Sequence, residues 1–220
     1  MRKMSCRVLI LSGSAMLGYL DLCVGSFIAM IVAKIVGVDV GLQHLLAGAL
    51  LAVSPDIDIP LIILFRKKEI IDHHETITHN PLFMVPTMTC LTWYFWGPMW
   101  ASIAVLCVLW HFIHDSEGVN EGSLAWFKPF TNLHWTPLKP LVLSEPKKNE
   151  FVGGYASLLH KYWLQPSTIS VQEMVLGSLC LLVSVSVTDS MLIGMVAFVL
   201  SWLGIAAVWS SSPLLVKYPA

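Results

Sequence analysis

Residues 82–110 contain no charged side chain and no histidine, and most of them are apolar. A helix crosses the hydrocarbon core of a bilayer with about 20 residues, so this stretch is too long for one span. Trp96, Gly97 and Pro98 interrupt it, and glycine and proline are residues that break helices. We therefore predict a helical hairpin, with one membrane helix over residues 82–95 and a second over 99–115.

The composition of the whole chain agrees with a membrane location. Charged residues make up 12% and hydrophobic residues 56% of the 220 positions, whereas soluble domains carry about 25% charged residues. This excludes an ordinary soluble domain, a disordered chain and a coiled coil. The formal charge of −1 gives no reason to expect nucleic acid as a partner. We predict an all-α, polytopic integral membrane protein that forms a single membrane domain over residues 1–220.

Four further apolar segments are predicted to be membrane helices. They cover residues 22–38, 41–54, 171–187 and 190–212, the last two forming a C-terminal hairpin over 171–212. Residues 8–20 are interpreted as a retained anchor, and a signal peptide is the alternative. Residues 116–170 form a polar, proline-rich excursion between the two groups of helices.

The basic residues predict the orientation in the membrane. The short turns near residues 38–40, 96–98 and 188–189 contain no lysine or arginine, and all basic residues except Lys34 fall on the other side. Lysine and arginine favour the cytoplasmic side of membrane proteins. We therefore expect a multi-pass protein of the inner (plasma) membrane, with the excursion in the cytoplasm and the lipid bilayer as its main partner.

Two aspartates, Asp56 and Asp58, follow an apolar helix in the sequence Pro-Asp-Ile-Asp-Ile-Pro at residues 55–60. The two prolines disfavour a continued helix, so we predict an extended segment, in which residues i and i+2 point the same way. Neighbouring carboxylates repel each other unless a cation or a proton lies between them. The pattern indicates a cation site, and a helix end with solvated carboxylates is the alternative.

The segment at residues 72–80 carries three histidines and two acidic residues. Imidazole and carboxylate groups are common metal ligands, so the segment offers five candidate ligands within nine residues and indicates a metal site. The alternative is a polar surface loop.

The third cluster ends the most apolar helix. It consists of His111, His114 and Asp115. Residues i and i+4 share one face of a helix, so His111 and Asp115 can reach one ion, with His114 beside them. Ionisable groups at membrane depth indicate function, because burying them without a partner is costly. A polar helix end at the interface is the alternative.

The type of ligand indicates the metal. Imidazole and carboxylate without thiolate suit Zn²⁺, Mn²⁺ or Fe, and the five cysteines include no CxxC pair. The clusters offer more ligands than one catalytic zinc needs, so we expect one to three ions, with Zn²⁺ first. Such metal clusters activate water for phosphoester hydrolysis.

These motifs resemble the YdjM-like inner-membrane proteins, a family described as LexA-regulated, membrane-bound, metal-dependent hydrolases. The resemblance covers residues 41–135, the predicted metal-site core, and includes the segment 55–60, His74 with Thr78 and His79, His111 with Asp115, Gly118 and the segment 126–129. It implies an α-helical fold distantly similar to zinc-dependent phospholipase C. The chain departs from the family pattern at Glu75, which replaces an arginine, and at Ile59, which replaces a histidine.

We therefore predict a membrane-embedded, metal-dependent hydrolase that cleaves a phosphoester of a lipid or lipid-linked substrate by metal-activated water. The predicted metal ligands are Asp56, Asp58, His74, His79, His111 and Asp115, and the predicted catalytic proton carriers are Glu75, His73 and His114. A metal transporter with ligands near the bilayer midplane and a non-catalytic scaffold with a closed structural metal site are the alternatives.

Overall fold

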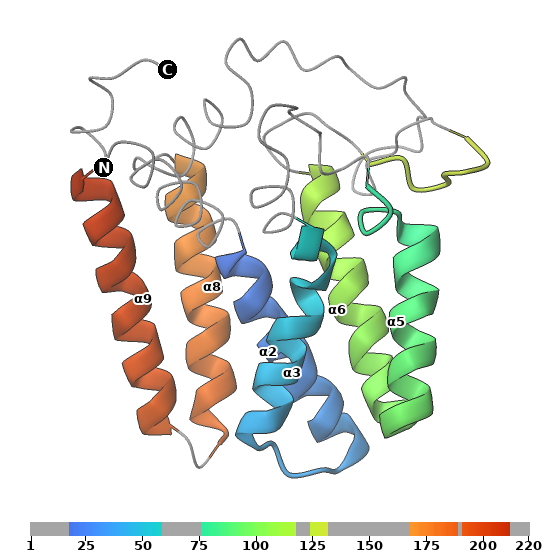
Figure 1. Cartoon of the computed structure of the whole chain (residues 1–220). Helices are drawn as coiled ribbons and strands as arrows, with labels where there is room; N and C mark the ends of the chain where they lie inside the picture. The colour runs from blue at the N-terminus through green and yellow to red at the C-terminus, as the bar shows by residue number, and fades with distance from the viewer. Residues whose placement is uncertain (1–17, 59–75, 118–123, 132–167, 189–190, 212–220) are drawn as a thin grey trace, which may run out of the picture.

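The computed structural model describes residues 18–58, 76–117, 124–131, 168–188 and 191–211. Every regular element in these ranges is a helix, and Figure 1 shows the long helices side by side with roughly parallel axes. The elements are α2 (Tyr19–Val36), α3 (Leu42–Ala52), the 3-10 helix η1 (Ser54–Ile57), α5 (Pro81–Trp96), α6 (Pro98–Glu117), α8 (Thr168–Ser186) and α9 (Met191–Ser211). The prediction of an all-α protein is confirmed for this part of the chain.

Each predicted apolar segment contains one of the α-helices, with bounds that differ by a few residues. Within the described ranges, two helices are long and apolar enough to cross a bilayer, Tyr19–Val36 and Pro98–Ser116. Three other apolar helical stretches are shorter: Leu42–Ala52, Ser170–Ser186 and Gly194–Ala207. Two such helices alone do not establish a polytopic arrangement, so the multi-pass topology stays a prediction.

Glycines lie at two of the turns between neighbouring helices, and the one at Gly97 was predicted. Gly37 ends α2 with φ at 78°, and Gly97 separates α5 from α6 with φ at 91°. Glycine adopts positive φ without the steric cost that a Cβ would add. The predicted turns at residues 38–40 and 96–98 are therefore confirmed, and the α5–α6 hairpin lies where the uncharged stretch placed it.

The central helix of the bundle is α2, which packs against α3, α6 and α8. Its contact with α3 is close: a Cβ added to Gly25 would lie 2.3 Å from the carbonyl oxygen of Gly48. Beside it, the Ser26 hydroxyl donates to the carbonyl of Leu45 at 3.0 Å. Small residues and polar contacts of this kind hold helices together in membranes. The outer helices α5 and α9 pack on α6 and α8, respectively.

The segment after α3 differs from its prediction. Pro55 lies in the 3-10 helix Ser54–Ile57 rather than in an extended strand-like segment. Proline is tolerated in the first turn of a helix because its missing N–H has no partner there. A 3-10 helix has three residues per turn, and Asp56 and Asp58 contact different nitrogens of the His79 ring. The prediction of an extended segment is wrong.

Residues 124–131, part of the predicted excursion, return to the helix bundle. Leu124 is buried against Met84 of α5 and Phe112 of α6. The Asn80 side chain, just before α5, donates to the carbonyl of Lys128 at 3.0 Å. This segment therefore holds the turn that carries His79 against α6.

Candidate metal centre

The polar end of α6 contributes two of the candidate ligands. His111 and Asp115 are one helical turn apart, and Nε2 of His111 lies 3.0 Å from Oδ2 of Asp115. This is the contact that their i, i+4 spacing predicts. His111 is fully buried, at 0% exposure. Its imidazole therefore needs polar partners within the protein.

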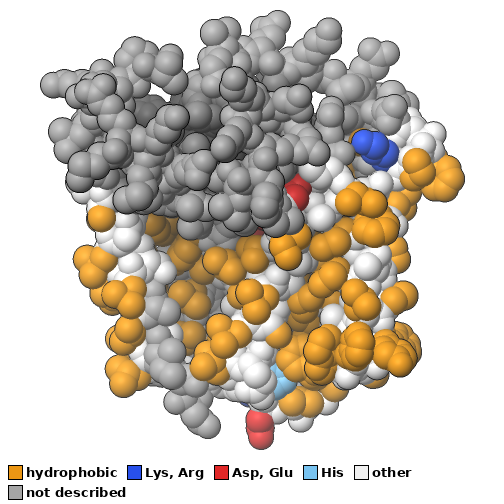
Figure 2. All heavy atoms as spheres, in the orientation of Figure 1, with side chains coloured by type: hydrophobic (Ala, Val, Ile, Leu, Met, Phe, Trp, Pro, Cys, Tyr) orange, Lys and Arg blue, Asp and Glu red, His pale blue; other side chains and the backbone are white. Residues whose placement is uncertain are grey.

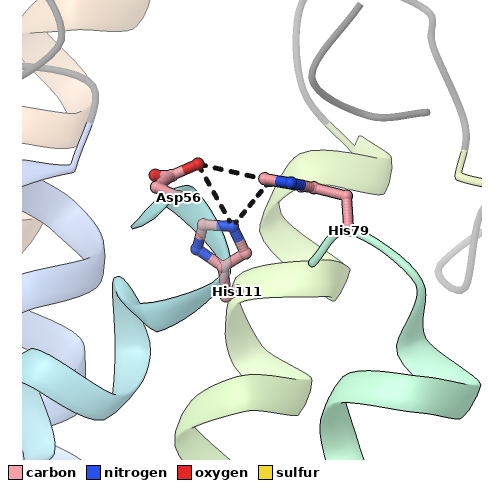
Figure 3. A group of neighbouring side chains, drawn as sticks. All are labelled: Asp56, His79 and His111. Atoms are coloured by element: carbon pink, nitrogen blue, oxygen red, sulfur yellow. Dashed lines mark hydrogen bonds and ion pairs between the residues drawn. The ribbon is translucent and has the colours of Figure 1, made fainter. Parts of the chain in front are cut away.

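Two other segments bring Asp56 and His79 to the same point (Figure 3). Nε2 of His79 lies 3.2 Å from Oδ1 of Asp56 and 3.5 Å from Nε2 of His111. Oδ1 of Asp56 lies 3.7 Å from Nε2 of His111. One ligand atom from each of these three residues lies within 4.8 Å of the other two. Asp115 is adjacent, with Oδ2 at 3.6 Å from Nε2 of His79.

These separations fit a divalent metal ion. A tetrahedral zinc site with Zn–N and Zn–O bonds of about 2.0–2.1 Å has ligand atoms about 3.3 Å apart. Five of the six distances among the four atoms named above run from 3.0 to 3.7 Å. Two imidazole nitrogens and two carboxylate oxygens are also a donor set that zinc accepts. The residues present could therefore hold such an ion.

The charge of His79 in the absence of metal follows from its surroundings. Burial disfavours the charged ring, but the carboxylates of Asp56, Asp58 and Asp115 outweigh this penalty and raise the pKa of His79 to about 9. Three carboxylates and two imidazoles thus share one small volume. Such a cluster takes up either protons or a cation to balance its charge.

Comparison with known proteins identifies the family. The chain matches the model of the YdjM inner membrane protein family over residues 16–212. The chain belongs to this family. No curated protein and no solved structure matches it, so the distant similarity to phospholipase C stays a prediction. The family and the two long apolar helices support a location in a membrane.

Not every acidic residue of the YdjM-like motifs lies at the convergence point. Asp58 lies behind His79, with Oδ2 at 3.7 Å from Nδ1, the ring nitrogen opposite the cluster. Its carboxylate also accepts a hydrogen bond from the Thr76 hydroxyl at 2.5 Å. This arrangement follows from the 3-10 helix, which turns Asp58 away from Asp56. His73, His74 and Glu75 lie outside the described residues.

Sequence reasoning missed Asp21, which the structure places beside the centre. Oδ2 of Asp21 lies 3.3 Å from Nδ1 of His111, and Oδ1 lies 3.0 Å from Nδ1 of His114. His114 in turn faces Glu173 of α8, at 3.6 Å. The predicted first span began at Leu22, one residue too late to include Asp21. A charged residue in the first turn of an apolar helix was the signal that could have found it.

Proposed function

We propose that the chain is a membrane-embedded, metal-dependent hydrolase that cleaves a phosphoester of a lipid or lipid-linked substrate. The observation that supports this most strongly is the convergence of Asp56, His79 and His111 from three separate segments, with Asp115 beside them. Grouped ligands at one end of a helix bundle favour a bound ion over solvated polar groups, because two of the four side chains are buried.

The chemistry of the site depends on which of its ligands are accessible to solvent and substrate. A divalent ion, Zn²⁺ first with Mn²⁺ or Fe as alternatives, would supply a Lewis acid and lower the pKa of a water molecule. The side chains of Asp56 and Asp115 are 22% and 19% exposed, whereas those of His79 and His111 are 0% and 1% exposed. The carboxylates thus line the accessible side, where a substrate can approach. An accessible side favours a catalytic site over a closed structural clamp.

The outer surface of the bundle indicates that α5, α8 and α9 also lie in lipid, in addition to the two long apolar helices. Figure 2 shows apolar side chains over much of the described surface. Leu91 of α5, Leu179 of α8 and Leu203 of α9 are 46%, 56% and 61% exposed. Soluble monomers rarely expose large contiguous apolar patches. We therefore propose a multi-pass arrangement with the metal end on the cytoplasmic side, which the distribution of lysine and arginine supports.

The position of the cluster also favours hydrolysis over transport. Asp56 follows α3, His79 precedes α5, and His111 lies in the last two turns of α6. Transporters hold their ions near the bilayer midplane on broken helices. A site at the helix ends is reached by a lipid head group that moves laterally in the bilayer. We assign His74 as a further ligand and His73 and Glu75 as proton carriers on the predicted motif alone.

The proposal is tested by metal content and hydrolysis measured together. The full chain is purified in detergent without chelator, supplied with Zn²⁺ or Mn²⁺, and assayed by elemental analysis. Release of phosphate or head group is then measured from vesicles that contain phosphomonoester and phosphodiester lipids. We expect bound metal and hydrolysis in the wild type, and the loss of both in the double variant His111→Ala/Asp115→Ala.

The control variant is His44→Ala, which removes a buried histidine from the other end of α3. A wild type that stays empty of metal would overturn the proposal entirely. Bound metal without hydrolysis of either lipid class would overturn the hydrolase and leave a metal-binding membrane protein.

A further inference from the structure

Asp21 is a carboxylate in a place where an isolated one would be costly. It lies in the first turn of α2, a candidate membrane span, and is only 2% exposed. A buried carboxylate needs hydrogen-bonded or charged partners. All three partners come from α6: the Trp110 indole N–H donates to Oδ1 at 2.9 Å, and His111 and His114 lie at 3.3 and 3.0 Å.

The two ring nitrogens of His111 face different groups. Nε2 faces Asp56, His79 and Asp115, the candidate metal ligands. Nδ1 faces Oδ2 of Asp21. At 3.3 Å this contact is an ion-pair approach, and Nδ1 of His111 makes no hydrogen bond in this geometry. An ionised carboxylate only accepts hydrogen bonds, so the charge of Asp21 favours a proton on Nδ1 over one on Nε2. The neutral ring then has its lone pair on Nε2, where a metal ion would bind.

We propose that Asp21 is a positioning residue for the metal centre, which selects the tautomer and the ring orientation of His111. The proposal rests on the metal site of the proposed function. Metal-ligating histidines generally donate their second N–H to a carboxylate or a carbonyl, which raises the basicity of the ligand. Asp21 supplies this carboxylate from a helix that carries none of the four candidate ligands.

The surroundings of Asp21 are built to hold it in place. Trp110 and His114 share its Oδ1, and their rings stack with centroids 5.9 Å apart. His114 is held on its far side by Glu173, with 3.6 Å between Nε2 and Oε1. These contacts leave Oδ2 directed at His111. His114, a predicted proton carrier, thus contacts Asp21, and Asp21 in turn contacts the candidate ligand His111.

Co²⁺ binding tests the proposal without any substrate. Co²⁺ is titrated into the detergent-purified full chain, with affinity from a competing chelator and ligand geometry from the visible spectrum. Asp21→Asn removes the charge and keeps the shape. We expect an affinity about 10–100-fold weaker, as for other outer-sphere partners of metal ligands, with an altered spectrum. The control Asp39→Asn removes an exposed carboxylate after α2 and is expected to leave both unchanged.

The outcomes separate this inference from the proposed function. Equal Co²⁺ affinity and spectrum in Asp21→Asn and in the wild type would overturn the role of Asp21 and leave the metal site standing. A wild type that binds no Co²⁺ would overturn both. Should Asp21→Asn fail to give monodisperse protein, Trp110→Phe decides. That variant removes one donor from Asp21 and keeps an aromatic ring, and it is expected to weaken binding severalfold, whereas unchanged binding would overturn the proposal.

Discussion

Buried histidines lie at both ends of the helix bundle, but their surroundings differ. His44, at the start of α3, is 4% exposed, and His79 and His111 are 2% and 0% exposed. The His44 ring stacks on Trp100, with centroids 5.2 Å apart and planes 5° apart, and its Nδ1 accepts the N–H of Gly41. His79 and His111 instead face carboxylates on both ring nitrogens.

The contrast teaches that burial alone does not make a histidine a ligand. Eight residues of α3 follow His44 before the helix ends at Ala52, a rise of about 12 Å at 1.5 Å per residue, and Asp56 lies beyond that end. Among the described residues, Asp21 of α2 and Asp115 of α6 join Asp56 and Asp58 around the histidines at the Asp56 end. A buried histidine without converging carboxylates serves as a packing and capping group, and the following experiments challenge this distinction.

The largest effect is expected from His79→Ala. The variant removes one of the four converging ligand atoms, so bound Zn²⁺ should fall to background, a greater loss than the about 10–100-fold typical of outer-sphere changes. Elemental analysis of the purified chain measures it. His44→Ala should retain full metal content. Equal metal loss in both variants would show that the difference between the two ends does not determine binding.

A smaller loss is expected from Asp58→Asn, which acts behind the His79 ring. The 3.7 Å contact with Nδ1 makes Asp58 an orienting group, so metal affinity should fall about 10–100-fold. Competition with a chelator measures the affinity, and Asp56→Asn provides the comparison. If Asp58→Asn proves as severe as His79→Ala, then Asp58 binds the metal directly, as the sequence predicted.

Acidification should weaken metal binding gradually. With a pKa of about 9, His79 carries a proton at neutral pH that a metal ion must displace. Apparent affinity should therefore fall about tenfold for each pH unit below that value. Titrations at several pH values measure this slope, and a flat profile would show that His79 is not a ligand.

The stability of the metal-free chain should change in the opposite direction with pH. The pKa of His79 is raised from 6.5 to about 9, so its charged form stabilises the fold. This contribution is fully present below about pH 6.5 and is lost as the pH rises through about 9. Thermal melts in chelator across this window would detect it, and His79→Ala should lack the trend.

The smallest effect is expected from Trp100→Leu at the other end. Loss of the stack on His44 should lower the free energy of unfolding by about 0.5–1.5 kcal/mol, while metal content stays unchanged. Thermal unfolding in detergent, followed by circular dichroism, measures the first, and elemental analysis the second. Metal loss in this variant would mean that the two ends of the bundle are coupled.

Local patterns were sufficient to predict most of the helices and one ligand pair. The uncharged stretch and Gly97 predicted the α5–α6 hairpin, because apolar length and a helix-breaking residue act within a few positions. His111 and Asp115 could be paired because helical spacing alone brings i and i+4 together. The apolar helix ends at Ala52, before Pro55, as the prolines predict, but Pro55 lies in a 3-10 helix rather than in an extended segment. Only the surrounding chain distinguishes these two conformations.

The sequence by itself determined which residue types are available: apolar helices, turns at glycine, and clusters of histidine and aspartate near helix ends. Tertiary structure decided which ring nitrogen meets which carboxylate. Asp21 reaches His111 only because α2 packs against α6, and Asp58 lies behind His79 only because η1 turns it there. Such contacts join segments far apart in the chain, and their geometry depends on how whole helices pack rather than on spacing within one of them.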